Sequence, residues 1–507
     1  MASLIPEEDS NITTTHTDAD QSGIHQPEIR PKASHEANIL HSAFFGRPLP
    51  NPYSATNNNT NDNASSSSSK KKSSRPQNER LCMGGHRETI FGLSLSSDGK
   101  YMASASQDSS ICIWDVNSHR LVAKLTEGID EKFECLRVAW MNTRQYDRTT
   151  NSYDGTTREN VVKYVLASSG ADGIVRLWSG TTTTAEGDKL KWQSAGKLDH
   201  SSLEKNGADV VGTSKEDESP QVYALQFVRS EAAAPNMDIL MTSANDCIYL
   251  WNIVADGSPQ SPADASKCQM SFLPYLSVRF THLDDGSDTN QFGGERNPNN
   301  ELYVFDASYC ESNDLMGVAL SDGTCRVVSL ANSGNESFVQ EQCVLSLPPG
   351  YFPGRMGHLT ALSWDKSGTR LATCIASGRV ILWLLQVVDR GGAQGLHPSC
   401  ISVLQGGHDA GRPLFGAKYC GGENEELLMT WGVDGKVCVW DSYSVGEVLN
   451  PLCTLVSHSN YPIYALDATD CGTSSKAQAS DKQKIRIALG GGSDGGFLGV
   501  PAYIYDV

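Results

Sequence analysis

The residue types best suited to chemistry in this 507-residue chain are a histidine, a serine and an aspartate that lie close together. His86, Ser104 and Asp108 are the types that form the base, nucleophile and orienting acid of a hydrolase triad. They fall within residues 85–115, which begin with Gly-His and end with Trp-Asp. No nucleophile motif accompanies them. A catalytic triad is one interpretation of the trio, and a buried hydrogen-bond network is the other.

Other patterns that would support enzymatic or metal chemistry are missing from the sequence. The 14 cysteines are spread singly, with no Cys-x-x-Cys pair. We therefore expect buried free thiols in a reducing compartment, not disulfides or a zinc site. The glycine-rich run 490–496 lacks the Gly-Lys-Ser/Thr ending of a phosphate-binding loop. We expect a protein that is not an enzyme, with no catalytic residue, no cofactor and no metal site.

Short apolar runs around the trio predict the elements that position it. Residues 90–95, 102–105 and 111–114 predict three strands. Asp-Gly at 98–99 and Asp-Ser at 108–109 predict the tight turns between them. A three-stranded meander cannot bury both of its faces alone, so it needs neighbours of the same kind.

A unit that opens with Gly-His and closes with Trp-Asp resembles the WD40 repeat, the blade unit of β-propellers. The resemblance implies that buried hydrogen bonds join His86, Ser104, Asp108 and Trp114 in one relay. Such a relay gives each buried polar group the partner that it needs. We expect the relay to be structural, because its parts recur along the chain.

Six weaker copies of the unit follow the first. Asp172 stands six residues before Trp178 in the second copy, and Asp434 stands six before Trp440 in the sixth. The resemblance implies that each pair belongs to the same structural relay in its own blade. The third, fourth and fifth copies lack either the turn Asp or the closing Trp. The resemblance therefore implies an all-β, seven-bladed WD40-type propeller over residues 80–507, with a disordered N-terminal tail.

Residues 1–79 have the composition of a disordered tail. They contain runs of Asn, Ser and Lys and no convincing amphipathic period. The basic, serine-rich segment 65–76 is either a solvated linker or a signal for nuclear import or phosphorylation. The apolar segment 41–53 is either a short docking motif or a segment without function.

The seventh unit supplies three strands before the sequence ends. We therefore expect residues 80–84 to pair with the last blade as its fourth strand, which would close the ring and remove two open sheet edges. Removal of residues 1–84 should then destabilise the protein, whereas removal of residues 1–75 should not.

The charge of the chain bears on its partners. The net charge is −18, and residues 81–507 contain 33 Lys and Arg against 50 Asp and Glu. An acidic body disfavours direct nucleic-acid binding and suits protein partners, including basic ones. The sequence has no apolar run long enough to span a bilayer and no secretory signal pattern. We expect an intracellular protein in the cytoplasm, the nucleus or both.

Propellers of this family mostly bind partners through faces and loops. The first strand of each blade lines the channel, and aligning these strands places Phe91, Tyr223, Phe415 and Tyr464 at one shared position near the upper mouth. Two interpretations stay open: an aromatic ring that binds a partner, or packing against neighbouring blades. Arg412, beside a turn of the same face, is a further candidate for partner binding.

We expect a non-catalytic scaffold or adaptor that assembles a multiprotein complex, in which the propeller itself is monomeric. One alternative is a substrate-recognition component of a ubiquitin ligase. The Trp-Asp-x-Arg docking sequence of that group is missing from both Trp-Asp ends, at 114–117 and 440–443. A second alternative is a nuclear propeller associated with histones or RNA.

Overall fold

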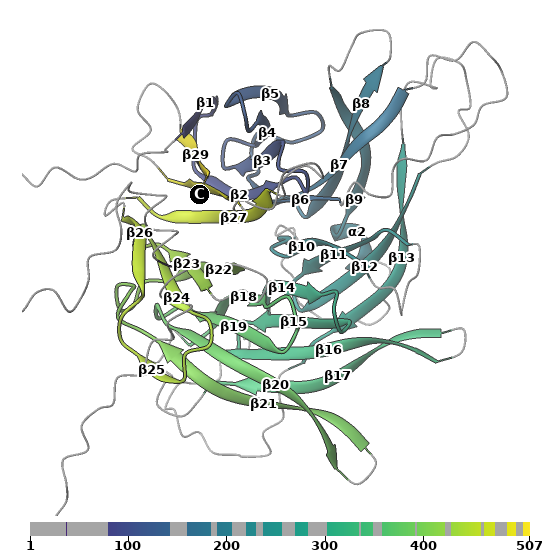
Figure 1. The fold of residues 1–507 in the computed structure, drawn as a ribbon. Helices are drawn as coiled ribbons and strands as arrows, with labels where there is room; N and C mark the ends of the chain where they lie inside the picture. The colour runs from purple at the N-terminus through teal and green to yellow at the C-terminus, as the bar shows by residue number, and fades with distance from the viewer. Residues whose placement is uncertain are drawn as a thin grey trace, which may run out of the picture.

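A computed structural model defines the fold. It describes Ala37 and residues 80–141, 160–183, 190–204, 220–229, 237–255, 269–281, 302–333, 336–347, 357–390, 393–420, 427–457, 461–471, 484–492 and 500–506. In this part of the chain the strands form seven sheets, and only Ala37 and α2 (Ser201–Glu204) are α-helical. The sheets stand in a ring, and each sheet turns one of its edge strands toward the centre (Figure 1). The prediction of an all-β, seven-bladed propeller is confirmed.

The strands of blades one to four follow one another along the chain. Blade one consists of β2 (Ile90–Leu95), β3 (Tyr101–Ser106), β4 (Ser110–Asp115) and β5 (Arg120–Leu125). Blade two consists of β6 (Cys135–Trp140), β7 (Asn160–Gly170), β8 (Ile174–Thr183) and β9 (Lys191–Asp199). Blade three consists of β10 (Leu225–Val228), β11 (Ile239–Ala244), β12 (Cys247–Ala255) and β13 (Met270–Arg279). Blade four consists of β14 (Val304–Cys310), β15 (Leu315–Leu320), β16 (Thr324–Ser333) and β17 (Glu336–Ser346).

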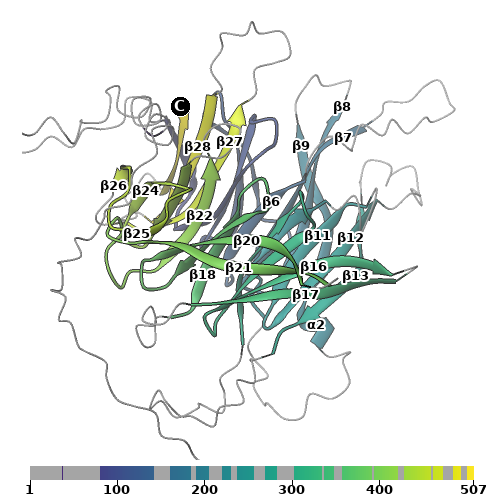
Figure 2. The same ribbon diagram turned by 60° about the horizontal axis from the view of Figure 1, so that its bottom comes forward.

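Blades five to seven complete the ring. Blade five consists of β18 (Leu359–Trp364), β19 (Arg370–Ile375), β20 (Val380–Arg390) and β21 (Ala393–Leu404), with β25 (Gly446–Val448) added at its outer edge. Blade six consists of β22 (Leu414–Cys420), β23 (Leu427–Gly432), β24 (Lys436–Asp441) and β26 (Cys453–Ser457). Blade seven consists of β27 (Ile463–Cys471), β28 (Lys484–Gly491) and β29 (Val500–Asp506), with β1 (Arg80–His86) as its fourth strand. The hairpins β16–β17 and β20–β21 are longer than most and extend outward from the ring (Figure 2).

The first and last strands of the propeller share a sheet. β1 pairs antiparallel with β29, with Arg80 opposite Ile504 and Cys82 opposite Ala502. Cys82 and Ile504 are fully buried in the apolar cluster between blades seven and one. The last blade therefore has four strands taken from both ends of the folded region.

Blade five has a fifth strand that comes from blade six. β25 pairs in parallel with β21, with Ser402 opposite Gly446. The buried Arg370 of β19 holds the segment before β25: it donates to the Ser442 carbonyl (3.3 Å), and its guanidinium lies 3.4 Å from the ring centre of Tyr443. The connection between β24 and β26 thereby ties the two neighbouring blades together.

Most inner strands carry a β-bulge directly after their first residue. The pairing with the second strand shifts register at this point in blades one, two, four, five, six and seven. In blade three the strand begins at Leu225, so Tyr223, which the sequence alignment placed on the first strand, lies just before it. A bulged residue leaves the ladder and re-aims its side chain. In these six blades the bulge therefore places one residue at the channel mouth, on the face we call upper.

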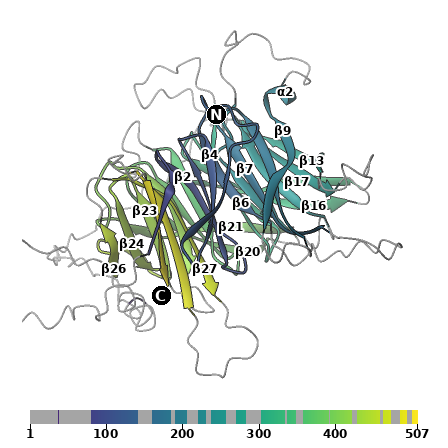
Figure 3. The ribbon, with the colours of Figure 1, turned by 90° about the horizontal axis from the view of Figure 1, so that it is seen from above.

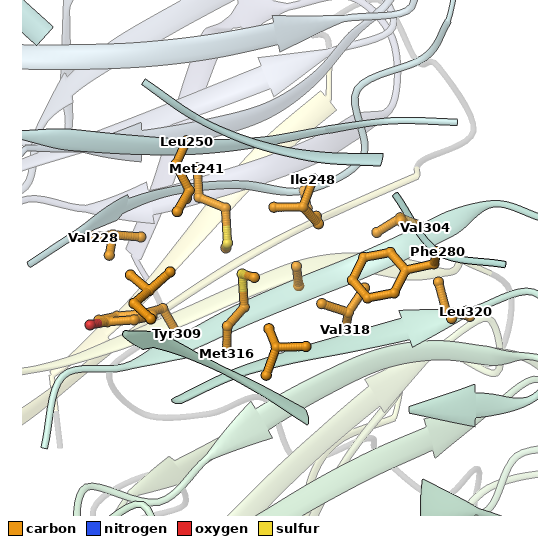
Figure 4. Packing of buried hydrophobic residues seen from close by; sticks show 14 of the residues in the cluster. Val228, Met241, Ile248, Leu250, Phe280, Val304, Tyr309, Met316, Val318 and Leu320 are labelled. Atoms are coloured by element: carbon orange, nitrogen blue, oxygen red, sulfur yellow. The ribbon is translucent and has the colours of Figure 1, made fainter. Parts of the chain in front are cut away.

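The core consists of apolar clusters between neighbouring blades. The described residues form seven such clusters, one at each contact between blades. Figure 4 shows the contact between blades three and four, where Met241 and Ile248 face Met316 and Val318. Each fully buried aliphatic side chain contributes about 1.5–3 kcal/mol. Because every blade buries two faces, the ring rigidly fixes the inner ends of the strands.

One residue of the N-terminal region lies in a core cluster. Ala37 is helical and 0% exposed, and it packs in the cluster between blades six and seven. These blades, marked by β24, β26 and β27, lie across the ring from β13 and β17 (Figure 3). The other residues of 1–79, including the segments 41–53 and 65–76 singled out in the sequence, lie outside the described residues.

Candidate functional site

The His86 relay of blade one is assembled from three strands. The Trp114 indole donates to Ser104 Oγ (2.9 Å), and Ser104 Oγ lies 2.7 Å from His86 Nε2. His86 Nδ1 lies 3.1 Å from Asp108 Oδ1. The network fits a tautomer in which Nδ1–H donates to Asp108 and Nε2 accepts from Ser104. Ser104 and Trp114 are 0% exposed, and the polar groups of the trio are engaged with one another.

The Asp108 carboxylate accepts hydrogen bonds from several donors of this network. The backbone N–H of Arg87 donates to it at 3.0 Å, Ser110 Oγ also donates to it, and Lys124 Nζ lies at 3.3 Å. Burial acts to raise the pKa of Asp108, but the hydrogen bonds from His86, Ser110 and Arg87 outweigh it and hold this pKa well below its usual range. The carboxylate is thus ionised and satisfied at neutral pH.

Blade six repeats the relay with a threonine. His408 Nδ1 lies 2.9 Å from Asp434 Oδ2, and His408 Nε2 lies 2.7 Å from Thr430 Oγ1. The Trp440 indole donates to Thr430 Oγ1 at 2.8 Å. Burial again opposes the shift, and hydrogen bonds from His408 and from the backbone lower the pKa of Asp434. Both members predicted for this blade, Asp434 and Trp440, belong to one network.

In blade two the hydrogen-bond partners of Asp172 and Trp178 differ from those of the predicted relay. Trp178 donates to Ser168 Oγ (2.9 Å), but Asp172 is bound by Arg176, whose Nη2 lies 2.6 Å from Asp172 Oδ2. The same guanidinium donates to the carbonyl of Gly128 at 2.6 Å. Asp172 and Trp178 therefore belong to separate contacts, and an arginine takes the place of the histidine. Blade four follows the same scheme in part: Arg326 donates to the carbonyl of Thr281 at 2.9 Å.

Blade three contains a relay histidine that the sequence pattern missed. His200 Nε2 lies 2.9 Å from Thr242 Oγ1, which accepts from the Trp251 indole at 3.0 Å. Its Nδ1 lies 3.2 Å from the carbonyl of Gly173, where other blades have a carboxylate. Burial lowers the pKa of His200 to about 4, against the opposing effects of Gly173 and Asp199. Residues 205–219 separate His200 from its blade and hid the match.

Three channel-mouth aromatics form one arc across blades six, seven and one. Phe415 stacks on Tyr464 with ring centres 4.6 Å apart, and Tyr464 meets Phe91 edge-on at 5.2 Å. All three side chains are half-buried. Phe415 also packs against the cluster between blades six and seven, whereas Phe91 and Tyr464 belong to no cluster of the described residues. Phe415 thus packs partly against a core cluster, whereas the described contacts of Phe91 and Tyr464 are with other rings of the arc.

A second arc crosses blades three, four and five. Tyr223 and Phe305 have ring centres 6.1 Å apart, and Phe305 lies 5.2 Å from the ring of His358. Phe305 is the bulged residue of β14, so it is the fourth-blade counterpart of Phe91. Sequence alignment missed Phe305 because the register of blade four was uncertain. The run Leu-Tyr-Val-Phe at 302–305 carries the signal, an aromatic residue after the first apolar residue of the strand.

Two non-aromatic residues interrupt the arcs. Leu136 and Thr360 occupy the bulge positions of blades two and five. Beside Leu136, β2 and β6 approach each other closely at Gly92. A Cβ at this position would lie 2.6 Å from the Leu136 carbonyl oxygen, so only glycine fits there without a shift of the backbone. Arg137 donates to the Phe91 carbonyl (3.1 Å) and bridges the inner strands of the two blades.

Below the mouth lies a cavity of about 490 Å³ lined by the inner strands. Its wall includes Arg137, Asp306, Lys418 and Asp467. Lys418 Nζ lies 3.2 Å from Asp467 Oδ1, and the Leu95 N–H donates to Asp467 Oδ2 at 2.8 Å. The charged groups of this wall therefore link neighbouring blades.

Asp306 is a carboxyl of the channel wall with a perturbed pKa. Backbone N–H groups of Leu362 and Ala307 each donate to it at 3.0 Å. Burial raises the pKa of Asp306 to about 6, against the opposing effects of Arg137 and these two hydrogen bonds. This carboxyl therefore begins to take up a proton at mildly acidic pH.

Arg412 lies three residues before Phe415 in the chain. It is exposed in the loop between β21 and β22, and its backbone N–H donates to the Asp409 carbonyl at 3.1 Å. The structure thus brings Phe91, Phe415 and Tyr464 together, places Tyr223 with Phe305, and has Arg412 as an exposed loop residue.

Membrane-spanning and metal-binding features can be assessed only for the described residues. No helix there has the length and apolar character needed to cross a bilayer. Within the same residues, no group of three His, Cys, Asp or Glu side chains is arranged to hold a metal ion.

Comparisons with known proteins agree with this architecture. The family described as "WD domain, G-beta repeat" matches residues 78–115. The chain is 35% identical over 103 residues to a component of chromatin assembly factor 1 from Gallus gallus, a match that covers 18% of each protein. It is 30% identical over 125 residues to a guanine nucleotide-binding protein beta-like protein of Encephalitozoon cuniculi, covering 20% of this chain and 37% of that protein.

A third relative comes from Chaetomium globosum and is named a probable cytosolic iron-sulfur protein assembly protein 1. It is 31% identical over 108 residues, covering 19% of this chain and 22% of that protein. The matched segments thus span 18%, 37% and 22% of the lengths of these three relatives.

Proposed function

Because the chain belongs to the WD40-repeat family of β-propellers, we propose that it is a non-catalytic scaffold that binds partner proteins at its upper channel mouth. Propellers of this family typically bind other proteins and typically perform no catalysis. In this chain the residues that resemble a catalytic triad are buried and engaged with one another.

The observation that carries the proposal is the pair of aromatic arcs. Phe91, Tyr223, Phe305, Phe415 and Tyr464 are half-buried on the rim of a rigid ring. Aromatic side chains lose few rotamers on binding and bury a large apolar area, which makes them frequent anchors at protein interfaces. A rim of this kind suits an extended peptide or loop that crosses the mouth.

Charge and the relatives support protein partners within the cell. The net charge of −18 favours basic proteins and disfavours phosphate backbones, so we propose no direct nucleic-acid binding. The relatives named for chromatin assembly and for cytosolic iron-sulfur protein assembly suggest a nuclear or cytoplasmic location. We propose a monomeric propeller within a larger complex.

The test compares variants of the two arcs. Phe91→Ala with Tyr464→Ala removes one arc, and Tyr223→Ala with Phe305→Ala removes the other. Leu121→Ala is the matched control, because Leu121 is 38% exposed on the outer strand β5. Affinity purification with mass spectrometry should recover partners with the wild type and the control, and lose them with one or both arc variants.

Thermal melting decides between binding and packing. If the arcs serve partners, the arc variants should melt close to the wild type while they lose partners. Retained partners together with a clearly lowered Tm would show that the aromatics are packing residues and would remove the proposal.

A nuclear role with basic partners is the alternative that one observation favours, the relative named for a chromatin assembly factor. Removal of residues 65–76, which carry the basic segment, tests it by microscopy. Unchanged nuclear content would remove the main support for this alternative. The ubiquitin-ligase alternative still lacks the expected Arg after either Trp-Asp pair.

A further inference from the structure

The buried Ala37 points to an intramolecular ligand of the propeller. It precedes β1 by more than 40 residues, yet it is 0% exposed within the core cluster between blades six and seven. Its cluster includes Cys453 and Leu455 of the outer strand β26 and Ile487 of blade seven. The cluster therefore counts a residue from outside the repeat among its buried members.

The sequence around Ala37 has the spacing of an amphipathic helix. Ala33, Ala37, Leu40 and Phe44 stand at positions i, i+4, i+7 and i+11, which share one face of an α-helix. Pro31 and Gly46 flank this stretch, and both residue types commonly lie just outside helices. The apolar segment 41–53 does not show this helical spacing, because it begins after Ala33, Ala37 and Leu40.

We propose that residues 33–45 bind in cis, as a helix, to the surface between blades six and seven, with Ala37 at the centre of the contact. The chain reaches this surface without strain, because each residue spans up to about 3.3–3.6 Å and the end of the linker, β1, lies on blade seven. An alanine suits a closely packed contact, since it has no side-chain entropy to lose. The contact shields the apolar residues of β26 from water.

This inference changes the expected effect of truncation. The sequence predicted that removal of residues 1–75 leaves stability unchanged, and the contact of Ala37 predicts a loss. The loss is separate from ring closure, because β1 begins at Arg80 and remains in such a truncated chain. It is also independent of the proposed function, because Ala37 packs in the cluster of blades six and seven and its test needs no partner protein.

Stability of three chains gives the first test. The full chain and a chain lacking residues 1–30 should melt at the same temperature, whereas a chain lacking residues 1–60 should melt several degrees lower. Ala37→Glu in the full chain should reproduce the loss, because it places a carboxylate in an apolar contact. The matched control is Ser42→Glu, on the opposite face of the proposed helix, which should leave Tm unchanged.

Binding in trans gives the second test. A fluorescent peptide of residues 28–50 should bind the chain lacking residues 1–60, raise its Tm and show saturable anisotropy. The same peptide with Ala37→Glu should not bind. Equal Tm for all three chains, or equal binding of the two peptides, would overturn the proposal.

Hydrogen exchange of the intact chain provides a readout that needs no truncation. Amides of residues 36–45 should exchange more slowly than those of residues 50–65 in the wild type, and the protection should be lost in Ala37→Glu. Exchange of residues 36–45 at the rate of an unstructured chain in the wild type would show that this segment does not dock.

Discussion

The polar networks within the blades and the aromatic rim of the channel use their residues in opposite ways. In the blade-one network, His86, Ser104 and Trp114 are buried and form hydrogen bonds with one another. At the rim, Phe91 and Tyr464 touch each other but remain half-buried. The residues that most resemble catalytic chemistry are thus engaged with one another, whereas the rim presents aromatic rings that are only half-buried.

The polar networks of the blades differ in the partners that their histidine or aspartate residues contact. Blades one and six pair a histidine with a carboxylate, blade two uses an Arg176–Asp172 ion pair, and in blade three His200 faces a backbone carbonyl. A hydrogen-bonded histidine and a buried ion pair depend differently on mutation and pH. Substitutions and changes of pH can therefore separate the networks from one another and from the channel wall.

The largest effect is expected at the ion pair of blade two. Arg176→Leu leaves Asp172 as an uncompensated carboxylate, and the side chains of Asp172 and Arg176 are only 8% and 6% exposed. Loss of one partner of a buried pair costs about 3–5 kcal/mol. Chemical or thermal denaturation should show this loss, and Arg176→Leu combined with Asp172→Asn should recover part of it. A single variant as stable as the wild type would mean that the pair contributes nothing.

The next effect is a dependence of stability on pH at His200. Its pKa in the fold, about 4, lies below the value of about 6.5 for an unfolded histidine. The unfolded chain therefore binds a proton that the fold excludes. Stability is fully present above pH 6.5 and is lost as pH falls toward 4, by on the order of 2 kcal/mol at pH 5.

His200→Gln should remove this part of the pH dependence, because glutamine can keep both hydrogen bonds and does not titrate. Tm measured between pH 5 and pH 7 for wild type and variant tests it. His397→Gln, at an exposed histidine of β21, serves as the control, since it leaves His200 and its contacts in place and should retain the slope. Parallel Tm curves for the wild type and His200→Gln would contradict the assignment.

The smallest effect is expected at the channel wall. The pKa of Asp306 in the fold, about 6, lies above its unfolded value, so its contribution is present below about pH 4 and is lost as pH rises through 6. Asp306→Asn removes the buried charge and should raise Tm relative to the wild type progressively from pH 5 to pH 7. A constant difference across this range would exclude titration of Asp306.

Much of the fold follows from local patterns. The runs around Asp108, Asp172 and Asp434 predicted both the strands and the turns, because the period of two and the turn chemistry act over a few residues. Three of the four aligned aromatics meet as one arc for the same reason, since all occupy one position of a repeated strand. Phe305 and His200 were missed where an irregular register or an insertion interrupted the pattern.

By itself, the sequence determined the repeats, the order of strands within each blade and the polar residues at each turn. Only the tertiary structure decided that Arg176, and not a histidine, meets Asp172. It also decided which aromatics touch across blades and where Ala37 is buried. Strand patterns arise from neighbours along the chain, whereas these contacts join residues that only the closed ring brings together. A buried charge or ring then takes whichever partner that geometry provides.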